Sequence, residues 1–177
     1  MKATDNNSIK KMILAAMFLA LALVLPFLTG QIKQIGKALC PMHIPVILCG
    51  YFCGPWYGLI IGLIAPILRM VFFGMPPLIP TGLAMSFELA TYGFVAGMLY
   101  KTLPKTKTNI YIALVAAMIS GRVVWGLVST IIYKASGMDF GWKAFVAGAF
   151  VSAIPGIIVQ LVLIPILVMI IEKNTKR

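Results

Sequence analysis

Acidic residues are scarce in this 177-residue chain, which has four Asp and Glu residues against fifteen Lys and Arg. Charged residues make up 11% of the sequence and hydrophobic residues 61%, and the mean hydropathy is +1.01. Soluble domains have about a quarter of their residues charged, so this composition excludes an ordinary water-soluble fold. Several apolar runs are long enough to cross a bilayer as α-helices. The sequence therefore predicts an integral membrane protein with a single domain over residues 1–177.

Histidine and cysteine are also rare, and the only histidine and all three cysteines lie within residues 40–53, CPMHIPVILCGYFC. In a helix, His43 and Cys49 would point to different faces, and Cys40 and Cys53 would lie ~20 Å apart. One tetrahedral ion cannot collect ligands placed in this way, so we predict no metal site. We interpret the cysteines as small buried hydrophobic residues and keep His43, where a loop enters the membrane, as a candidate substrate contact.

Motifs of enzymes and of nucleic-acid binders are missing as well. The chain has no G-x-x-x-x-G-K-[ST] nucleotide-binding loop and no H-E-x-x-H zinc motif. Its net charge of +11 comes mostly from cations that flank apolar segments and do not form a basic patch with interleaved aromatics. We therefore expect no catalytic residue, no cofactor and no nucleic-acid partner, and we expect that the protein is not an enzyme.

Six apolar segments are predicted to cross the membrane, at about 9–28, 42–52, 56–73, 81–100, 110–133 and 144–171. The predicted fold class is therefore all-α, a compact bundle of six transmembrane helices. The second segment is too short for a ~30 Å hydrocarbon core at about 1.5 Å per residue, so it must be oblique or partly re-entrant. The first segment follows lysines, as in a signal peptide, but no clear A-x-A cleavage site follows Pro26, and we expect it to be retained.

Alternating crossings divide the cations unevenly between the two faces. With the N-terminus inside, four cations lie outside, namely Lys33, Lys37, Lys134 and Lys143. Nine lie on the cytoplasmic side, namely Lys2, Lys10, Lys11, Lys101, Lys105, Lys107, Lys173, Lys176 and Arg177. Both termini are therefore predicted to be cytoplasmic. The outer connections are longer or richer in Pro, Gly and aromatic residues, so we expect a site that opens outward.

Three charged residues, Arg69, Glu88 and Arg122, lie within the predicted spans, in the middle or outer part of the bundle. Each would cost about 2.5–3.5 kcal/mol at a helix centre, so each should face protein or water. Glu88 could simply pair with one arginine and hold helices together, but one carboxylate cannot neutralise two cations. The remaining guanidinium predicts a pocket for a small molecule, and its planar fork suits a carboxylate.

Other polar and aromatic residues belong to the same outer half. Tyr92 lies one turn after Glu88, Trp125 lies outward of Arg122, and Trp142 begins the last span. Tryptophan and tyrosine at this depth often form an interfacial belt, which is the alternative to a ligand contact. Gln160 lies deep in the sixth span and could contact a ligand or tie helices together.

Small residues recur every four positions in several spans. They include Gly54, Gly58 and Gly62, then Gly93 and Gly97, then Ala144, Gly148, Ser152 and Gly156. Such stripes let helix backbones approach closely. Ala16 and Ala20 form a similar pair in the first segment, which could pack within the bundle or receive a partner's helix.

The chain resembles the substrate-binding S components of energy-coupling factor (ECF) vitamin transporters over essentially its whole length. The resemblance rests on the length, the six helices with both ends inside, the pair Ala16 and Ala20, and the stretch HIPVILCGYFCGPWYGLIIGLIAPILR with its G-P-x-x-G turn. It implies a bacterial plasma (inner) membrane protein that captures a vitamin from outside. It also implies partners: a membrane coupling subunit, which Ala16 and Ala20 would face, and two cytoplasmic ATPases.

The resemblance further implies a pocket built from the fourth to sixth helices and the outer loops. On this chain the pocket would draw on Gln31, Lys33, Lys37, His43, Arg69, Glu88, Tyr92, Arg122, Trp125, Trp142 and Gln160. The surplus arginine favours an anionic vitamin, with pantothenate as the first candidate and folate or another vitamin behind it. The alternatives are an autonomous small secondary transporter or channel for a small anionic solute, and a purely structural subunit.

Overall fold

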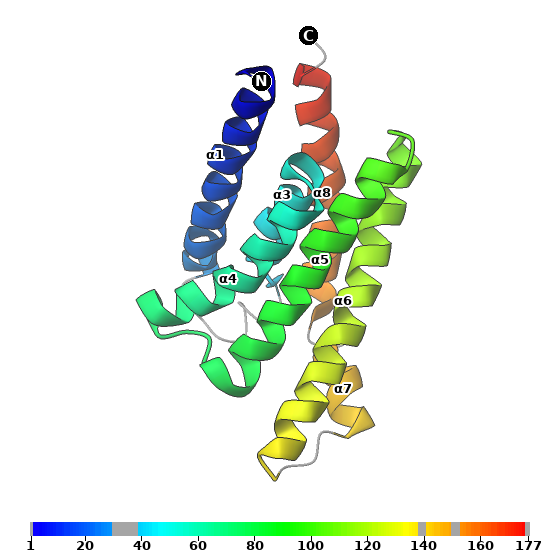
Figure 1. Cartoon of the computed structure of the whole chain (residues 1–177). Helices are drawn as coiled ribbons and strands as arrows, with labels where there is room; N and C mark the ends of the chain where they lie inside the picture. The colour runs from blue at the N-terminus through cyan, green and yellow to red at the C-terminus, as the bar shows by residue number, and fades with distance from the viewer. Residues whose placement is uncertain (1, 30–38, 138–140, 150–152, 176–177) are drawn as a thin grey trace.

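The computed structural model describes residues 2–29, 39–137, 141–149 and 153–175, and these ranges contain helices and no strand. The α-helices are α1 (Lys2–Val24), α3 (His43–Cys53), α4 (Pro55–Phe73), α5 (Leu83–Thr102), α6 (Lys107–Ala135), α7 (Trp142–Ala149) and α8 (Ile154–Thr175). A 3₁₀ turn, η1 (Leu25–Thr29), follows α1, and a π-helical turn, η2 (Leu78–Gly82), precedes α5. The two termini lie at the same end of the bundle (Figure 1).

Five helical segments are long and apolar enough to cross a membrane: Asn7–Phe27, Pro55–Phe73, Leu78–Thr102, Lys107–Ala135 and Ile154–Asn174. Large apolar side chains are exposed along all of them, as expected of surfaces that face lipid. The second predicted segment, at about 42–52, is α3, which has 11 residues and is ~17 Å long at about 1.5 Å per residue. All of α3 except Phe52 is buried, so α3 is a core helix surrounded by α1, α4, α5 and α8.

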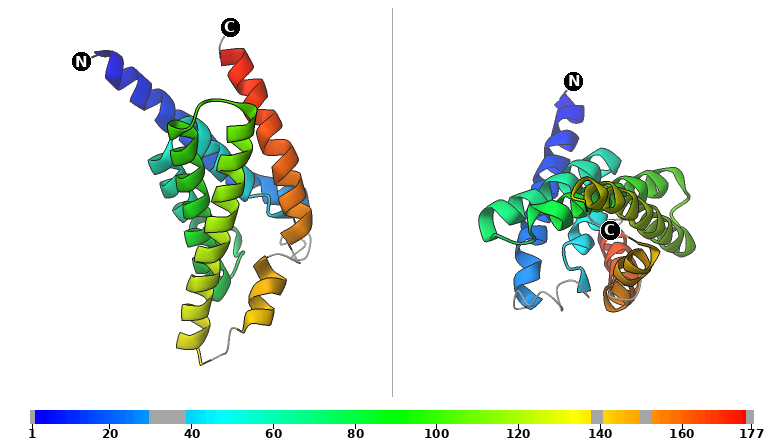
Figure 2. Two further views of the ribbon diagram at one scale, coloured as in Figure 1. Left: turned by 90° about the vertical axis from the view of Figure 1, so that its right-hand side faces the viewer. Right: turned by 90° about the horizontal axis from the view of Figure 1, so that it is seen from below.

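The single helix expected over residues 144–171 is instead two helices, α7 and α8, separated by residues that lie outside the described ranges. Pro155 is the second residue of α8, a position where a missing N–H costs nothing. Inside a helix, proline clashes with the carbonyl group four residues earlier, so Pro155 favours a helix that begins here over one that continues through it. Figure 2 shows α7 at the end of the bundle opposite the termini, beside the end of α6.

The close packing predicted from the glycine stripes is present where α4 meets α5. A Cβ atom added to Gly93 of α5 would lie 2.3 Å from the carbonyl oxygen of Gly58, and one added to Gly62 would lie 2.4 Å from Leu89. Between α3 and α4, Gly54 has a φ of 106°, which a side-chain-bearing residue rarely adopts, and Pro55 then starts α4. These contacts fix α5 against α3 and α4, and α5 carries the charged residue at the centre of the site.

Candidate functional site

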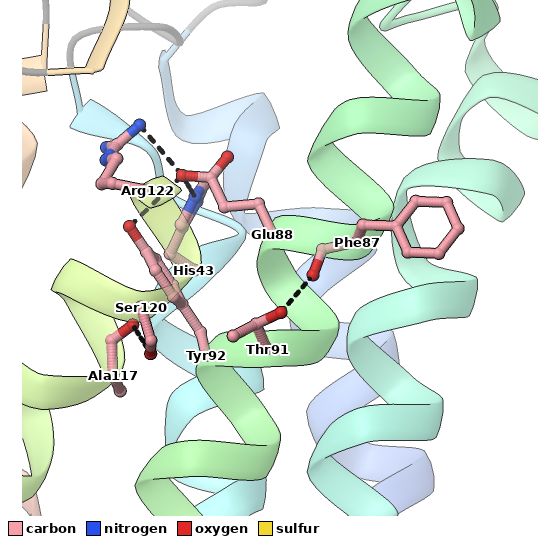
Figure 3. Close-up of polar contacts among 8 residues, drawn as sticks. All are labelled: His43, Phe87, Glu88, Thr91, Tyr92, Ala117, Ser120 and Arg122. Carbon is pink, nitrogen blue, oxygen red and sulfur yellow. Dashed lines mark hydrogen bonds and ion pairs between the residues drawn. The ribbon is translucent and has the colours of Figure 1, made fainter. Parts of the chain in front are cut away.

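Four polar side chains from three helices meet inside the bundle (Figure 3). Glu88 and Tyr92 lie one turn apart on α5, His43 is the first residue of α3, and Arg122 lies near the middle of α6. Arg122 Nη1 is 2.9 Å from Glu88 Oε1, and the Tyr92 hydroxyl donates a hydrogen bond of 3.2 Å to the same oxygen. His43 Nε2 lies 3.7 Å from that oxygen, and its ring meets the Tyr92 ring edge-on. We call these four residues the Glu88 cluster.

The Glu88 cluster is almost completely shielded from its surroundings. The exposed fraction is 0% for Tyr92, 2% for His43, 3% for Glu88 and 8% for Arg122. Removing a carboxylate and a guanidinium from water costs several kcal/mol for each ion, and their attraction often does no more than offset that cost. A buried ion pair is therefore weak evidence for a stabilising role. Ionisable residues kept inside a membrane bundle are more often part of a binding site or solute pathway.

Several buried polar atoms, in the cluster and on the neighbouring helix α8, have no hydrogen-bond partner among the described residues. They are His43 Nδ1 and Nε2, Arg122 Nε, and Oε1 of Gln160, which is itself 1% exposed on α8. The 3.7 Å between His43 Nε2 and Glu88 is too long for a hydrogen bond. Helix α8 packs against both α3 and α6, which carry His43 and Arg122. Each unsatisfied buried group costs about 1–3 kcal/mol, so this arrangement favours a polar ligand that supplies both donors and acceptors.

Cys40 is a neighbour of the cluster that the sequence reasoning missed, because it treated the cysteines only as small hydrophobic residues. Its side chain is buried and lies within interaction range of Arg122 and Glu88. Its φ is 46°, a left-handed conformation that is uncommon outside glycine. The carbonyl of Cys40 accepts a hydrogen bond from the backbone N–H of His43, which forms the turn into α3. The left-handed backbone of Cys40 is the one local feature that sets this residue apart, and it cannot be read from the sequence.

Arg69 lies apart from the Glu88 cluster, at the junction of α1 and α4. Its Nη1 donates a hydrogen bond of 2.6 Å to the carbonyl oxygen of Leu23, and its guanidinium lies over the rings of Phe27 and Phe73. Leu23 is in the last turn of α1, just before Pro26, whose missing N–H leaves backbone acceptors of that turn without an intrahelical donor. Of the two arginines, Arg122 is thus the one paired with Glu88, and Arg69 instead meets a backbone carbonyl and two aromatic faces.

The remaining predicted site residues divide into three groups. Trp125 stacks against Phe145 and contacts the position of Gly148, so it joins α6 to α7. Gln31, Lys33 and Lys37 and the side chain of Trp142 lie outside what the structure describes. Ala16 and Ala20 are exposed on the outer face of α1, in an apolar stripe with Ile9, Met12, Ile13, Met17, Leu21 and Val24.

The bundle combines long apolar spans with a buried polar cluster in which some donor and acceptor atoms have no partner among the described residues. The family model described as ECF transporter, substrate-specific component, matches residues 10–168. The chain therefore belongs to this family, as its sequence resemblance predicted, and it is a substrate-specific membrane subunit of a transporter rather than an enzyme. Comparisons with curated proteins and with solved structures found no match.

Proposed function

We propose that this protein captures a vitamin or related micronutrient from outside the cell and delivers it for ATP-driven uptake. Its partners in this proposal are a membrane coupling subunit and two cytoplasmic ATPases, and its location is the bacterial plasma membrane. The positive-inside rule supports a cytoplasmic location for the lysine-rich end of the bundle, where both termini lie. The Glu88 cluster then belongs to the outer half, because it lies near the start of α3 and of α5 at the opposite end.

The observation that carries the proposal is the set of buried polar atoms without partners on His43 and Arg122, beside Glu88, and on Gln160 of α8. Arg122 Nε and the His43 nitrogens can meet a ligand carboxylate or hydroxyl, and Gln160 Oε1 can accept from a hydroxyl or amide N–H. Pantothenate carries a carboxylate, hydroxyls and an amide, and it remains the first candidate within this proposal. The ion pair of Arg122 with Glu88 also means that an anionic ligand has to share this guanidinium with an internal carboxylate.

Ligand binding to the purified protein tests this site. With a panel of vitamins read by tryptophan fluorescence or mass spectrometry, we expect one compound to bind the wild type tightly. Arg122→Ala should weaken that binding by about 2–5 kcal/mol, roughly 30-fold or more, since one partner of a buried charge pair is lost. Arg122→Lys keeps the charge without the planar fork, and it serves as a second variant in case the alanine variant does not fold.

The matched control for this measurement is Thr91→Val. Thr91 lies on α5 between Glu88 and Tyr92 in sequence, but its hydroxyl donates to the carbonyl oxygen of Phe87 and takes no part in the cluster (Figure 3). Its affinity should stay within about threefold of the wild type, a change under 1 kcal/mol. Loss of binding in Arg69→Ala but not in Arg122→Ala would move the site to the junction of α1 and α4 and contradict the proposal.

Uptake with and without partners separates this proposal from an autonomous transporter. The alanines Ala16 and Ala20 are exposed, and small residues allow a partner helix to approach closely. We expect Ala16→Leu with Ala20→Leu to leave vitamin binding unchanged and to abolish most ATP-dependent uptake in proteoliposomes that contain the partner subunits. Val115→Leu with Val123→Leu on the exposed face of α6 is the control, with uptake retained. Transport by this chain alone would favour the autonomous transporter instead.

A further inference from the structure

A cavity lies at the end of the bundle opposite the Glu88 cluster. It has a volume of ≈ 420 Å³ and is lined by residues from the α5–α6 connection, the start of α6 and the last turns of α8. This volume falls within the range of about 300–1,000 Å³ that is usual for ligand sites. Most of its polar lining residues are exposed, so the cavity is an open groove at the surface of the bundle, beside the loop that joins α5 to α6.

The groove has a basic rim and an apolar floor. Lys105, Lys107 and Lys173 form the rim; Lys105 lies in the α5–α6 connection, Lys107 begins α6, and Lys173 is in the last turn of α8. Ile110, Met169 and Ile170 form the floor, about one helical turn further along α6 or back along α8. The groove therefore offers cations at the level where a membrane surface lies and apolar side chains just below that level, where acyl chains begin.

One acidic residue, Glu172, also lines the groove, but its charge is already engaged. It accepts a hydrogen bond from the Tyr100 hydroxyl and lies 3.9 Å from Lys105 Nζ, which itself sits over the Tyr100 ring. Lys107 and Lys173 remain at the rim, and Lys107 is the first residue of α6, where the helix dipole adds positive potential. The net charge of the lining, three lysines against one glutamate, favours an anion.

We propose that this groove binds the headgroup of an anionic phospholipid, with the phosphate at Lys107 and Lys173 and the first part of an acyl chain on Met169 and Ile170. Basic pockets between transmembrane helices are a recurrent way to hold such headgroups. The apolar floor favours a lipid over a free phosphate, which would gain nothing from Ile110, Met169 and Ile170. The lipid would tie the end of α8 to the start of α6.

Native mass spectrometry of the detergent-purified full chain tests the proposal, with phosphatidylglycerol, phosphatidylcholine and inorganic phosphate as probes. Each lysine near a membrane surface contributes about 1 kcal/mol toward an anionic lipid. Lys107→Gln with Lys173→Gln should therefore weaken phosphatidylglycerol binding by about 30-fold, and Lys173→Gln alone by about fivefold. Lys10→Gln with Lys11→Gln removes the same charge from exposed positions on α1 and should bind phosphatidylglycerol as the wild type does.

The probes decide between the lipid and other occupants. Phosphatidylcholine should bind more weakly than phosphatidylglycerol, and inorganic phosphate should not displace the lipid. Equal lipid binding in the two double variants would overturn the proposal, and so would displacement by inorganic phosphate. If the Lys107 and Lys173 variant still binds lipid but loses uptake in the presence of partner subunits, the groove is a contact for a partner protein. That result would also overturn the proposal.

Discussion

Glu88→Ala is expected to destabilise the protein by about 3–5 kcal/mol, because it leaves Arg122 as a buried guanidinium without its carboxylate. The same change removes the acceptor of the Tyr92 hydroxyl and the carboxylate that faces His43. The loss should appear as a lower midpoint in denaturation by sodium dodecyl sulfate, measured by helical circular dichroism. Ligand binding should be lost with it, since α3, α5 and α6 meet at this side chain.

Glu88→Gln separates the charge from the shape. The amide keeps an oxygen that can accept from Tyr92 and Arg122, so we expect a smaller loss of stability than in Glu88→Ala. The affinity for an anionic ligand should change more than the stability does, because the Glu88 carboxylate that competes for Arg122 has become a neutral amide. Thr91→Ala on the same helix is the control and should change stability by no more than about 1 kcal/mol. A Glu88→Ala variant as stable as this control would show that Arg122 has another partner in the bundle.

Gly93→Ala is expected to have the second large effect, since it adds one methyl group where two helix backbones touch. The new Cβ would lie 2.3 Å from the carbonyl oxygen of Gly58 and 2.8 Å from its Cα, and neither atom can move without its helix. Alanine gains about 0.5–1 kcal/mol over glycine in a helix, but overpacking costs about 1–3 kcal/mol or more. The clash therefore outweighs the gain, and α4 and α5 have to separate.

Separation of α4 and α5 should also reach the site, because Tyr92 precedes Gly93 directly and Glu88 lies little more than one turn before it. We expect Gly93→Ala to lower both the denaturation midpoint and the affinity for the ligand. Gly141→Ala is the matched control, because a Cβ there would have nothing within 4 Å and its backbone is not left-handed. Equal midpoints for the two variants would contradict the close packing of α4 on α5.

The sequence predicts much of the fold because hydropathy, proline and glycine report on single helices. It predicts the short second helix, the end of the first near Pro26, and the close packing at the glycine stripes. The sequence also predicts an ion pair between Glu88 and one of the two arginines. Which arginine forms that pair depends on how α5 and α6 are rotated about their axes. That rotation is set by contacts between helices, such as Tyr92 against Gly121, that no single-segment pattern encodes.

Two further features lie beyond sequence patterns for the same reason. The division of the last span into α7 and α8 was not predicted, because the span carries no charged residue and Pro155 can also be tolerated inside a membrane helix. The approach of Cys40 to Arg122 depends on a left-handed residue in a turn, which only glycine or asparagine would have signalled.

The shortness of α3 has a consequence for how the chain is made. Eleven apolar residues are too few for a stable crossing, so α3 is a poor substrate for membrane insertion when it emerges alone during synthesis. Only Gly54 separates it from α4, and the two helices pack against each other. They should therefore enter the bilayer together as a hairpin. In the proposed orientation, a topology reporter that ends the chain directly after Gly54 should stay on the outer side, whereas the same reporter inserted after Gly54 in the full-length chain should lie on the cytoplasmic side.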